Sequence, residues 1–171
     1  MKENYVLTVK AEDRPGLLHI ITGVLNRKLI PIISLSAAPT DIHDIMLITL
    51  EIEISEKALD PLLYKLENII EVFAVEAVAY NKALCLRAAY FKMSKSFLEN
   101  PKMSVLHKYS VAIVNWYPDA ILIAKYGTDS EIRTIYNELE GSHLIGFSQT
   151  GLITESKLIG EGQSSVISMA A

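Results

Sequence analysis

The stretch YVLTVKAEDRPGLLHIITGVL, residues 5–25, decides the fold of the first half of the chain. Up to Ala11, a more apolar and a more polar set of side chains alternate, which is the pattern of a half-buried strand. From Leu17 onward, apolar residues recur every three or four positions, which predicts an amphipathic helix. Residues 13–16 separate the two, and Pro15 suits a first helical position because no N–H is needed there. We therefore expect a strand, a tight turn and a helix.

Four further elements are expected in the first half. Apolar residues on both faces predict a strand over residues 32–38, and strict alternation predicts another over residues 46–54. A second helix begins either at Pro61 or after Ser55, with Pro61 inside it. A fourth strand covers residues 72–79. Right-handed crossovers turn the order β-α-β-β-α-β into a ferredoxin-like sandwich, in which two helices cover four antiparallel strands.

The second half repeats this order of elements without repeating the residues. Thr128 and Glu131 form a capping box that opens its clearest helix, and Gly141 closes that helix. Apolar patterning predicts four strands, over residues 83–93, 109–116, 120–126 and 144–149. We expect an α+β protein of two ferredoxin-like βαββαβ modules in tandem. The expected domains are residues 1–80, residues 81–160 and a flexible tail over residues 161–171.

The composition indicates a folded chain and disfavours two classes of partner. Of 171 residues, 50% are apolar and 21% charged, enough to bury a core. The net charge of −4 lacks the basic excess that nucleic-acid binders normally carry. No apolar run approaches the ~20 residues that cross a bilayer, and the N-terminus lacks a secretory signal pattern. The single cysteine, Cys85, cannot form an internal disulfide, so we expect a cytoplasmic protein with no membrane partner.

Patterns that would indicate catalysis are missing from the sequence. The four histidines are scattered, so no metal site is expected, and Cys85 lies within a predicted strand as a buried, inert thiol. Neither a Gly-x-Ser-x-Gly elbow nor a phosphate-binding loop occurs. Glu51 and Glu53 share one strand face, which we interpret as the solvated outer face of the sheet rather than a catalytic pair. No catalytic site and no cofactor are therefore expected.

The turn at residues 13–16 is the most distinctive local feature. The free N–H groups of Gly16, Leu17 and Leu18 would point out of a helix N-terminus, where an anion is favoured by ~0.3–1 kcal/mol. Asp13, just ahead, could take an ammonium group, so that the turn would receive a free amino acid. The alternative is an ordinary helix start, with Asp13 helping to cap the helix.

The same residues carry a resemblance to a known family. Residues 13–18, followed by the helix and by Ser34-Leu-Ser-Ala-Ala-Pro-Thr40, resemble the ACT domain, and more narrowly the small regulatory subunit of acetolactate synthase (acetohydroxyacid synthase). A hydrophobic strand over residues 111–115 and a closing Thr150-Gly151 are also similar. The resemblance extends from about Tyr5 to Gly160. The turn implies the fold, and the segment that ends at Thr40 implies the narrower family.

The resemblance implies a regulatory mechanism. Small subunits of this family form homodimers in which ACT domains pair through their second strands, and valine binds at the seam. The subunit activates a separate catalytic chain, which uses thiamine diphosphate, magnesium and FAD to condense pyruvate, and valine reverses the activation. The apolar segment at residues 30–33 is unusual for an edge strand unless it is covered, and side-by-side pairing would cover it.

Residue by residue, the resemblance assigns effector binding to seven positions. The turn of one chain supplies Asp13, Arg14, Gly16, Leu17 and Leu18, and the partner chain closes the site with Pro31 and Ile32. The sequence departs from the family pattern at four positions: Leu29 and Pro31 replace a glycine and an asparagine, Ile45 replaces an arginine, and Gln149 replaces a basic residue. Pro31 has no N–H and no side-chain amide, so a polar contact to the effector is lost there.

Two other functions stay open. The first is a free-standing ACT amino-acid sensor that acts on another target. The second, a small ferredoxin-like enzyme of the acylphosphatase kind, needs an arginine and an asparagine close together. Arg14 and Asn26 are the nearest candidates, but they flank the predicted helix at opposite ends, which disfavours this enzyme.

Overall fold

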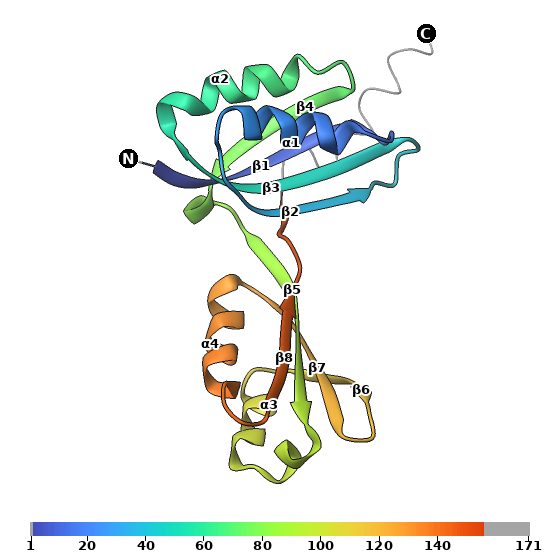
Figure 1. Cartoon of the computed structure of the whole chain (residues 1–171), viewed down its shortest axis with the longest axis vertical. Helices are drawn as coiled ribbons and strands as arrows, with labels where there is room; N and C mark the ends of the chain where they lie inside the picture. The colour runs from blue at the N-terminus through green and yellow to red at the C-terminus, as the bar shows by residue number, and fades with distance from the viewer. Residues whose placement is uncertain (1, 156–171) are drawn as a thin grey trace. The chain divides into compact units, whose positions relative to one another are not determined.

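The computed structural model describes residues 2–155, which fold as two units that we treat separately (Figure 1). The first unit contains residues 2–84 and 151–155, and the second contains Cys85–Thr150. The chain leaves the first unit after Leu84 and returns to it after Thr150. The expected boundaries near residues 80 and 160 stay predictions, and the tail expected over residues 161–171 lies outside the described residues.

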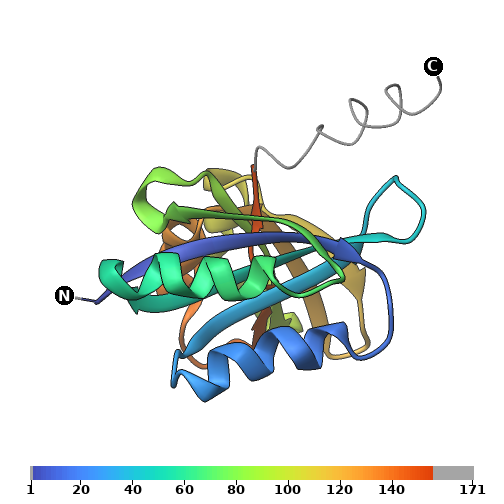
Figure 2. The ribbon, with the colours of Figure 1, turned by 90° about the horizontal axis from the view of Figure 1, so that it is seen from above.

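The first unit has the predicted βαββαβ order. Its four strands are antiparallel neighbours in the order β2-β3-β1-β4, which is the ferredoxin-like arrangement. Figures 1 and 2 show both helices on the same face of this sheet. The elements are β1 (Lys2–Glu12), α1 (Leu17–Arg27), β2 (Ile32–Pro39), β3 (Ile45–Ser55), α2 (Glu56–Glu67) and β4 (Val72–Ala79), followed by a 3-10 turn (Tyr80–Lys82).

The core of the first unit lies between this sheet and its two helices. Alternate residues of β1, such as Leu7 and Val9, are fully buried there. From the helices, Ile21 of α1 and Leu62 of α2 pack into the same cluster. The alternation in β1 and the helical spacing in α1 and α2 therefore specify one shared apolar layer.

Our interpretation of Glu51 as solvated is wrong. It lies on the sheet face away from the helices, as expected, but it is only 4% exposed. The Ser34 hydroxyl of the neighbouring strand donates a hydrogen bond to Glu51 Oε2 at 3.2 Å. Alternation identifies the face of a strand residue, whereas burial also depends on what covers that face. Glu53, two residues along, is half-buried.

The second helix follows the longer of the two alternatives. It begins at Glu56, with Ser55 in extended conformation as its N-cap, and it keeps Pro61 inside. A proline in a helix removes the hydrogen bond to the carbonyl four residues earlier. Here that carbonyl belongs to Lys57, and both Pro61 and Lys57 are exposed, so water can replace the lost donor.

Helix α1 ends in a Schellman motif built on a leucine. The Ile30 N–H donates to the Leu25 carbonyl at 3.1 Å and the Leu29 N–H to the Asn26 carbonyl at 3.0 Å. Leu29 occupies the left-handed position of the motif, with φ of 54°, where glycine is usual. Its side chain is 88% exposed, whereas that of Ile30 is buried in the core. The motif turns the chain directly into β2.

The second unit repeats the architecture. Its sheet order, β6-β7-β5-β8, matches that of the first unit, so the chain is a tandem of ferredoxin-like modules. Two short 3-10 segments (Lys95–Glu99 and Pro101–Met103) and a one-turn helix lie between the first and second strands of this unit. The other elements are β5 (Cys85–Ser94), α3 (Ser104–Lys108), β6 (Ala112–Trp116), β7 (Ala120–Gly127), α4 (Asp129–Leu139) and β8 (Leu144–Gln149); β9 (Ile153–Thr154) belongs to the first unit.

Local signals in the second unit form as predicted. The Thr128 N–H donates to Glu131 Oε2 at 2.8 Å, and the Glu131 N–H donates to Thr128 Oγ1 at 3.3 Å, which completes the capping box. These donors hold the pKa of Glu131 below its ordinary value. Ser110 follows α3 in the left-handed conformation, in a second Schellman motif. Among residues 2–155, no helix has the length and apolar character needed to cross a membrane.

Candidate effector-binding site

The predicted turn leaves the sheet between two neighbouring loops, and each loop anchors it. The Glu12 N–H donates to the Glu71 carbonyl in the α2–β4 loop, and the Asp13 N–H donates to the Asp44 carbonyl in the β2–β3 loop, both at 2.8 Å. Both acceptors are far from the turn in sequence. The turn is therefore held from two sides before α1 begins at Leu17.

Gly16 sets the direction in which the turn enters the helix. It is the N-cap of α1, with φ of 92°, a left-handed conformation that residues with a side chain rarely adopt. A Cβ at this position would have no atom within 4 Å, so the conformation and not a close approach requires glycine. The same emptiness leaves room beside the first turn of the helix.

The amide groups at the helix start are only partly available. We expected the Leu17 N–H to be free, but it donates to the Arg14 carbonyl at 3.4 Å. The Leu17 side chain is 1% exposed. Within the described part of the chain, the amides of Gly16 and Leu18 form no hydrogen bond. These two amides are the donors that the turn offers to an anion.

The two charged residues of the turn differ in their surroundings. Arg14 Nη1 lies 3.0 Å from Glu71 Oε1, in an ion pair whose carboxylate side is largely buried. The exposed Asp13 carboxylate makes no ion pair with any residue of the described range. Asp13 can therefore receive a cation, whereas Arg14 ties the turn to the α2–β4 loop. Glu71, 57 residues away, carried no signal in the sequence pattern.

Pro31 and Ile32 do not join these residues within one chain. Ile32 pairs with Ile52, which pairs with Tyr5 near the start of β1, whereas the turn follows the end of β1. The eleven residues of α1, roughly 16 Å of helix, separate the two groups. Apart from the buried Leu17, the residues of both groups are at least partly exposed, and β2 is an edge strand of its sheet. A site that uses all seven residues therefore requires a second copy of the chain.

The two other departures from the family pattern are Ile45, which lies beside the turn, and Gln149, which lies in the second unit. Ile45 pairs with Glu12 in the sheet and is half-buried, so no guanidinium stands next to the turn from that position. Gln149 belongs to the second unit, where it lines a hollow beside α4. No group of three or more histidine, cysteine or acidic side chains is placed to hold a metal ion within the described residues.

Comparison with known proteins places these features in a wider context. No protein-family model matches the chain. The acetolactate synthase small subunit of Mycolicibacterium smegmatis is 19% identical over 154 residues, which cover 90% of this chain and 91% of that protein. The corresponding protein of Mycobacterium leprae is 22% identical over 157 residues, with the same coverage.

A solved structure shows the same architecture. The crystal structure of the acetolactate synthase small subunit from Thermotoga maritima aligns with a TM-score of 0.81, covering 90% of this chain and 96% of that one, at 12% identity. At this identity the likeness establishes the fold. The sequence similarity covers both modules in the two mycobacterial proteins. In sequence and in fold, the chain is therefore similar to the small subunits of acetolactate synthase along nine tenths of its length.

Proposed function

We propose that the chain is the regulatory small subunit of an acetolactate synthase and acts on a separate catalytic chain. The observation that carries this proposal is similarity that runs through both modules and covers nine tenths of this chain and of its relatives. An isolated ACT-like domain would explain only the first module. A regulatory role, a cytoplasmic setting and the absence of a catalytic site of its own are parts of the same proposal.

The proposal includes a homodimer through the edge strand β2. Ile33 of this strand is 49% exposed, an unusual position for a large apolar residue on an open sheet edge. A two-fold axis beside β2 would pair the strand with its own copy in antiparallel fashion. The start of one strand would then meet the end of the other. The partner's Pro31 and Ile32 would thereby reach the sheet end that carries the turn.

In this arrangement, the completed site suits an amino acid with an apolar side chain. The carboxylate binds the amides of Gly16 and Leu18, and the ammonium group binds Asp13. Pro31 and Ile32 supply an apolar wall but no hydrogen-bond donor to the effector. Valine is the first candidate. Its binding would oppose activation of the catalytic chain.

The decisive experiment measures acetolactate formation by the cognate catalytic chain, with and without this protein, across a valine titration. A rise in rate that valine reverses supports both the subunit and the effector site. A rise that valine does not change keeps the subunit and rejects valine as effector. If the protein does not change the rate, the subunit proposal fails.

A pair of variants at Gly16 tests the placement of the carboxylate. Gly16→Asp puts a negative charge where the effector carboxylate binds, and we expect it to abolish the effector response. Gly16→Asn is the matched control, because it has the same shape and the same tolerance of left-handed backbone but no charge. Equal loss in both variants would point to backbone strain, and retained response in Gly16→Asp would place the site elsewhere.

A free-standing amino-acid sensor is the second candidate. The turn that would receive an amino acid lies within this chain and its own copy, and no catalytic chain is needed to build it. Ligand at one hundred times its dissociation constant adds ~2.7 kcal/mol of stability. For a chain of this size, that corresponds to roughly 5–10 °C in melting temperature. A panel of the twenty amino acids that produces no shift would contradict this candidate.

A further inference from the structure

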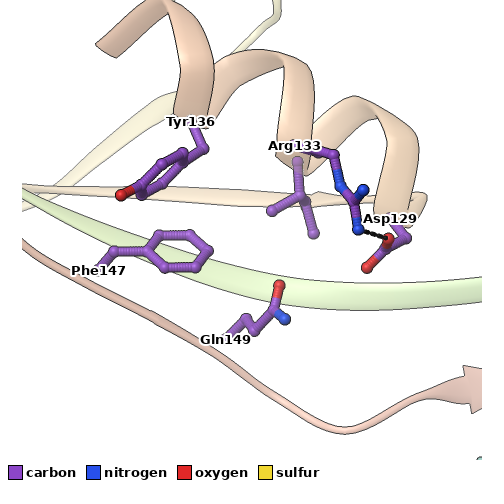
Figure 3. A pocket seen from close by; sticks show the side chains of 6 residues that line it. Asp129, Arg133, Tyr136, Phe147 and Gln149 are labelled. Atoms are coloured by element: carbon purple, nitrogen blue, oxygen red, sulfur yellow. Dashed lines mark hydrogen bonds and ion pairs between the residues drawn. The ribbon is translucent and has the colours of Figure 1, made fainter. Parts of the chain in front are cut away.

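The second unit contains a hollow of about 250 Å³ between helix α4 and strand β8 (Figure 3). Apolar and polar groups divide its lining. Ile132, Tyr136 and Phe147 form the apolar part, and Asp129, Arg133 and Gln149 form the polar part. All six residues belong to one unit. The hollow is distinct from the turn at residues 13–16, which belongs to the other unit.

Two aromatic rings make the apolar wall rigid. Tyr136 and Phe147 meet edge to face, with ring centroids 5.0 Å apart and an interplanar angle of 67°. Phe147 also packs against the buried ring of Phe91, with centroids 5.1 Å apart. Phe147 nevertheless remains 38% exposed. A large aromatic face is therefore fixed in place and accessible from the hollow.

The polar side of the hollow offers one exposed cation, Arg133. Arg133 Nη2 lies 3.5 Å from Asp129 Oδ2, at the long limit of a hydrogen bond, and the Arg133 side chain is 77% exposed. Asp129 Oδ1 lies 3.1 Å from Nε of Arg87, whose side chain is buried. Because Arg87 holds Asp129, Arg133 can turn toward a ligand without leaving that carboxylate unpaired. Figure 3 shows Arg133 and Asp129 at one end of the hollow and the two rings at the other.

We propose that this hollow is a second small-molecule site, which binds a monocarboxylate with an apolar side chain of about four to seven carbons. Arg133 holds the carboxylate, Gln149 offers an amide beside it, and the apolar part of the ligand lies against Tyr136 and Phe147. The volume is at the small end of ligand sites, which excludes a nucleotide. The Asp129 carboxylate disfavours a phosphate dianion beside it. This site does not depend on the function proposed for the first unit.

The test is a titration of the full-length protein with 4-methylpentanoate and with its neutral amide, followed by NMR. The expected result is a saturable shift of the Ile132 methyl signals with the acid, and weaker binding of the amide by about ten- to a hundredfold, because a hydrogen bond to a charged group is lost. Arg133→Met, which keeps the length of the side chain, should reduce acid binding by the same factor. Lys95→Met, at another exposed cation of this unit, should not change it.

Three results would overturn the proposal. The first is the absence of a saturable shift up to about 20 mM ligand, which is well above a millimolar dissociation constant. The second is equal binding of the acid and the amide. The third is an equal loss of acid binding in Arg133→Met and Lys95→Met. Gly16→Asp separates this site from the other one. The variant should leave the Ile132 shifts unchanged, and a loss of these shifts would show that the ligand acts through the first unit.

Discussion

Gly151 follows the closing threonine of the second unit and lies against the edge strand β2 of the first. A Cβ on this glycine would stand 2.7 Å from the Leu35 carbonyl oxygen and 3.0 Å from its carbon. Both atoms belong to the backbone, so rotation of a side chain cannot relieve the overlap. A Cβ would also stand 3.2 Å from Cβ of Ser36. Gly151→Ala must therefore displace either strand β2 or the returning segment.

The cost follows from these distances. Contacts under 3.0 Å between a methyl group and backbone force a shift, and overpacking of this kind costs ~1–3 kcal/mol. For a chain of 171 residues, that is roughly 3–10 °C in melting temperature. Gly146→Ala is the matched control, because a Cβ there has nothing within 4 Å. We expect the control to change stability by less than about 1 kcal/mol in either direction.

Thermal unfolding followed by circular dichroism measures the loss for both variants. Hydrogen exchange then locates it, and we expect faster exchange in β2 of Gly151→Ala and unchanged exchange in β6 of the second unit. If Gly151→Ala melts with the wild type and β2 exchanges at its normal rate, the close approach is not a constraint. If Gly146→Ala loses as much stability, the loss reflects glycine replacement in general and not the contact with Leu35.

Three further predictions concern single residues. Leu29→Gly should stabilise the first unit by ~1 kcal/mol in chemical denaturation, because it relieves a left-handed leucine, and Leu29→Ala, which keeps the strain, should not. The capping donors of Thr128 lower the pKa of Glu131, and a hydrogen bond from Lys108 lowers the pKa of Glu138. The stability that each carboxylate contributes is therefore present above its ordinary pKa and is lost as the pH falls through the lowered value. Glu131→Gln should therefore flatten the acid side of the stability profile, whereas Glu140→Gln, an exposed control, should leave it unchanged. Pro31→Asn restores an amide and should tighten amino-acid binding in calorimetry by about two- to tenfold; unchanged affinity would show that Pro31 does not face the effector.

Periodicity predicted most of the fold because the alternating strands and the amphipathic helices depend on local patterns. The 3-10 segments, α3 and β9 were not predicted in this way. The alternation in β3, the spacing in α1 and the capping box at Thr128 each act within a dozen residues. The surroundings of the candidate effector-binding site were only partly predictable, because they depend on contacts between residues far apart in the sequence. Arg14 and Glu71 are 57 residues apart, and only the fold brings the α2–β4 loop beside the turn. Glu51 shows the same limit, since its face was predictable and its burial was not.

The hollow in the second unit had no sequence signature either. Arg133 and Asp129 are four residues apart on α4, a spacing that usually marks an exposed helix pair. The buried partner of Asp129, Arg87, comes from β5, and the aromatic wall comes from β8. Only the sheet order, in which β5 and β8 are neighbours, places these groups around one space.

The departures from the family pattern in the loop before β2 change its chemistry more than its path. Leu29 adopts the left-handed conformation that a glycine would adopt, and the Schellman hydrogen bonds around it are complete. The chain therefore still enters β2 at Ile32 in register with Ile52. What is lost is a donor at Pro31 and an easy conformation at Leu29. For the proposed effector site, we therefore expect reduced affinity and not a relocated ligand.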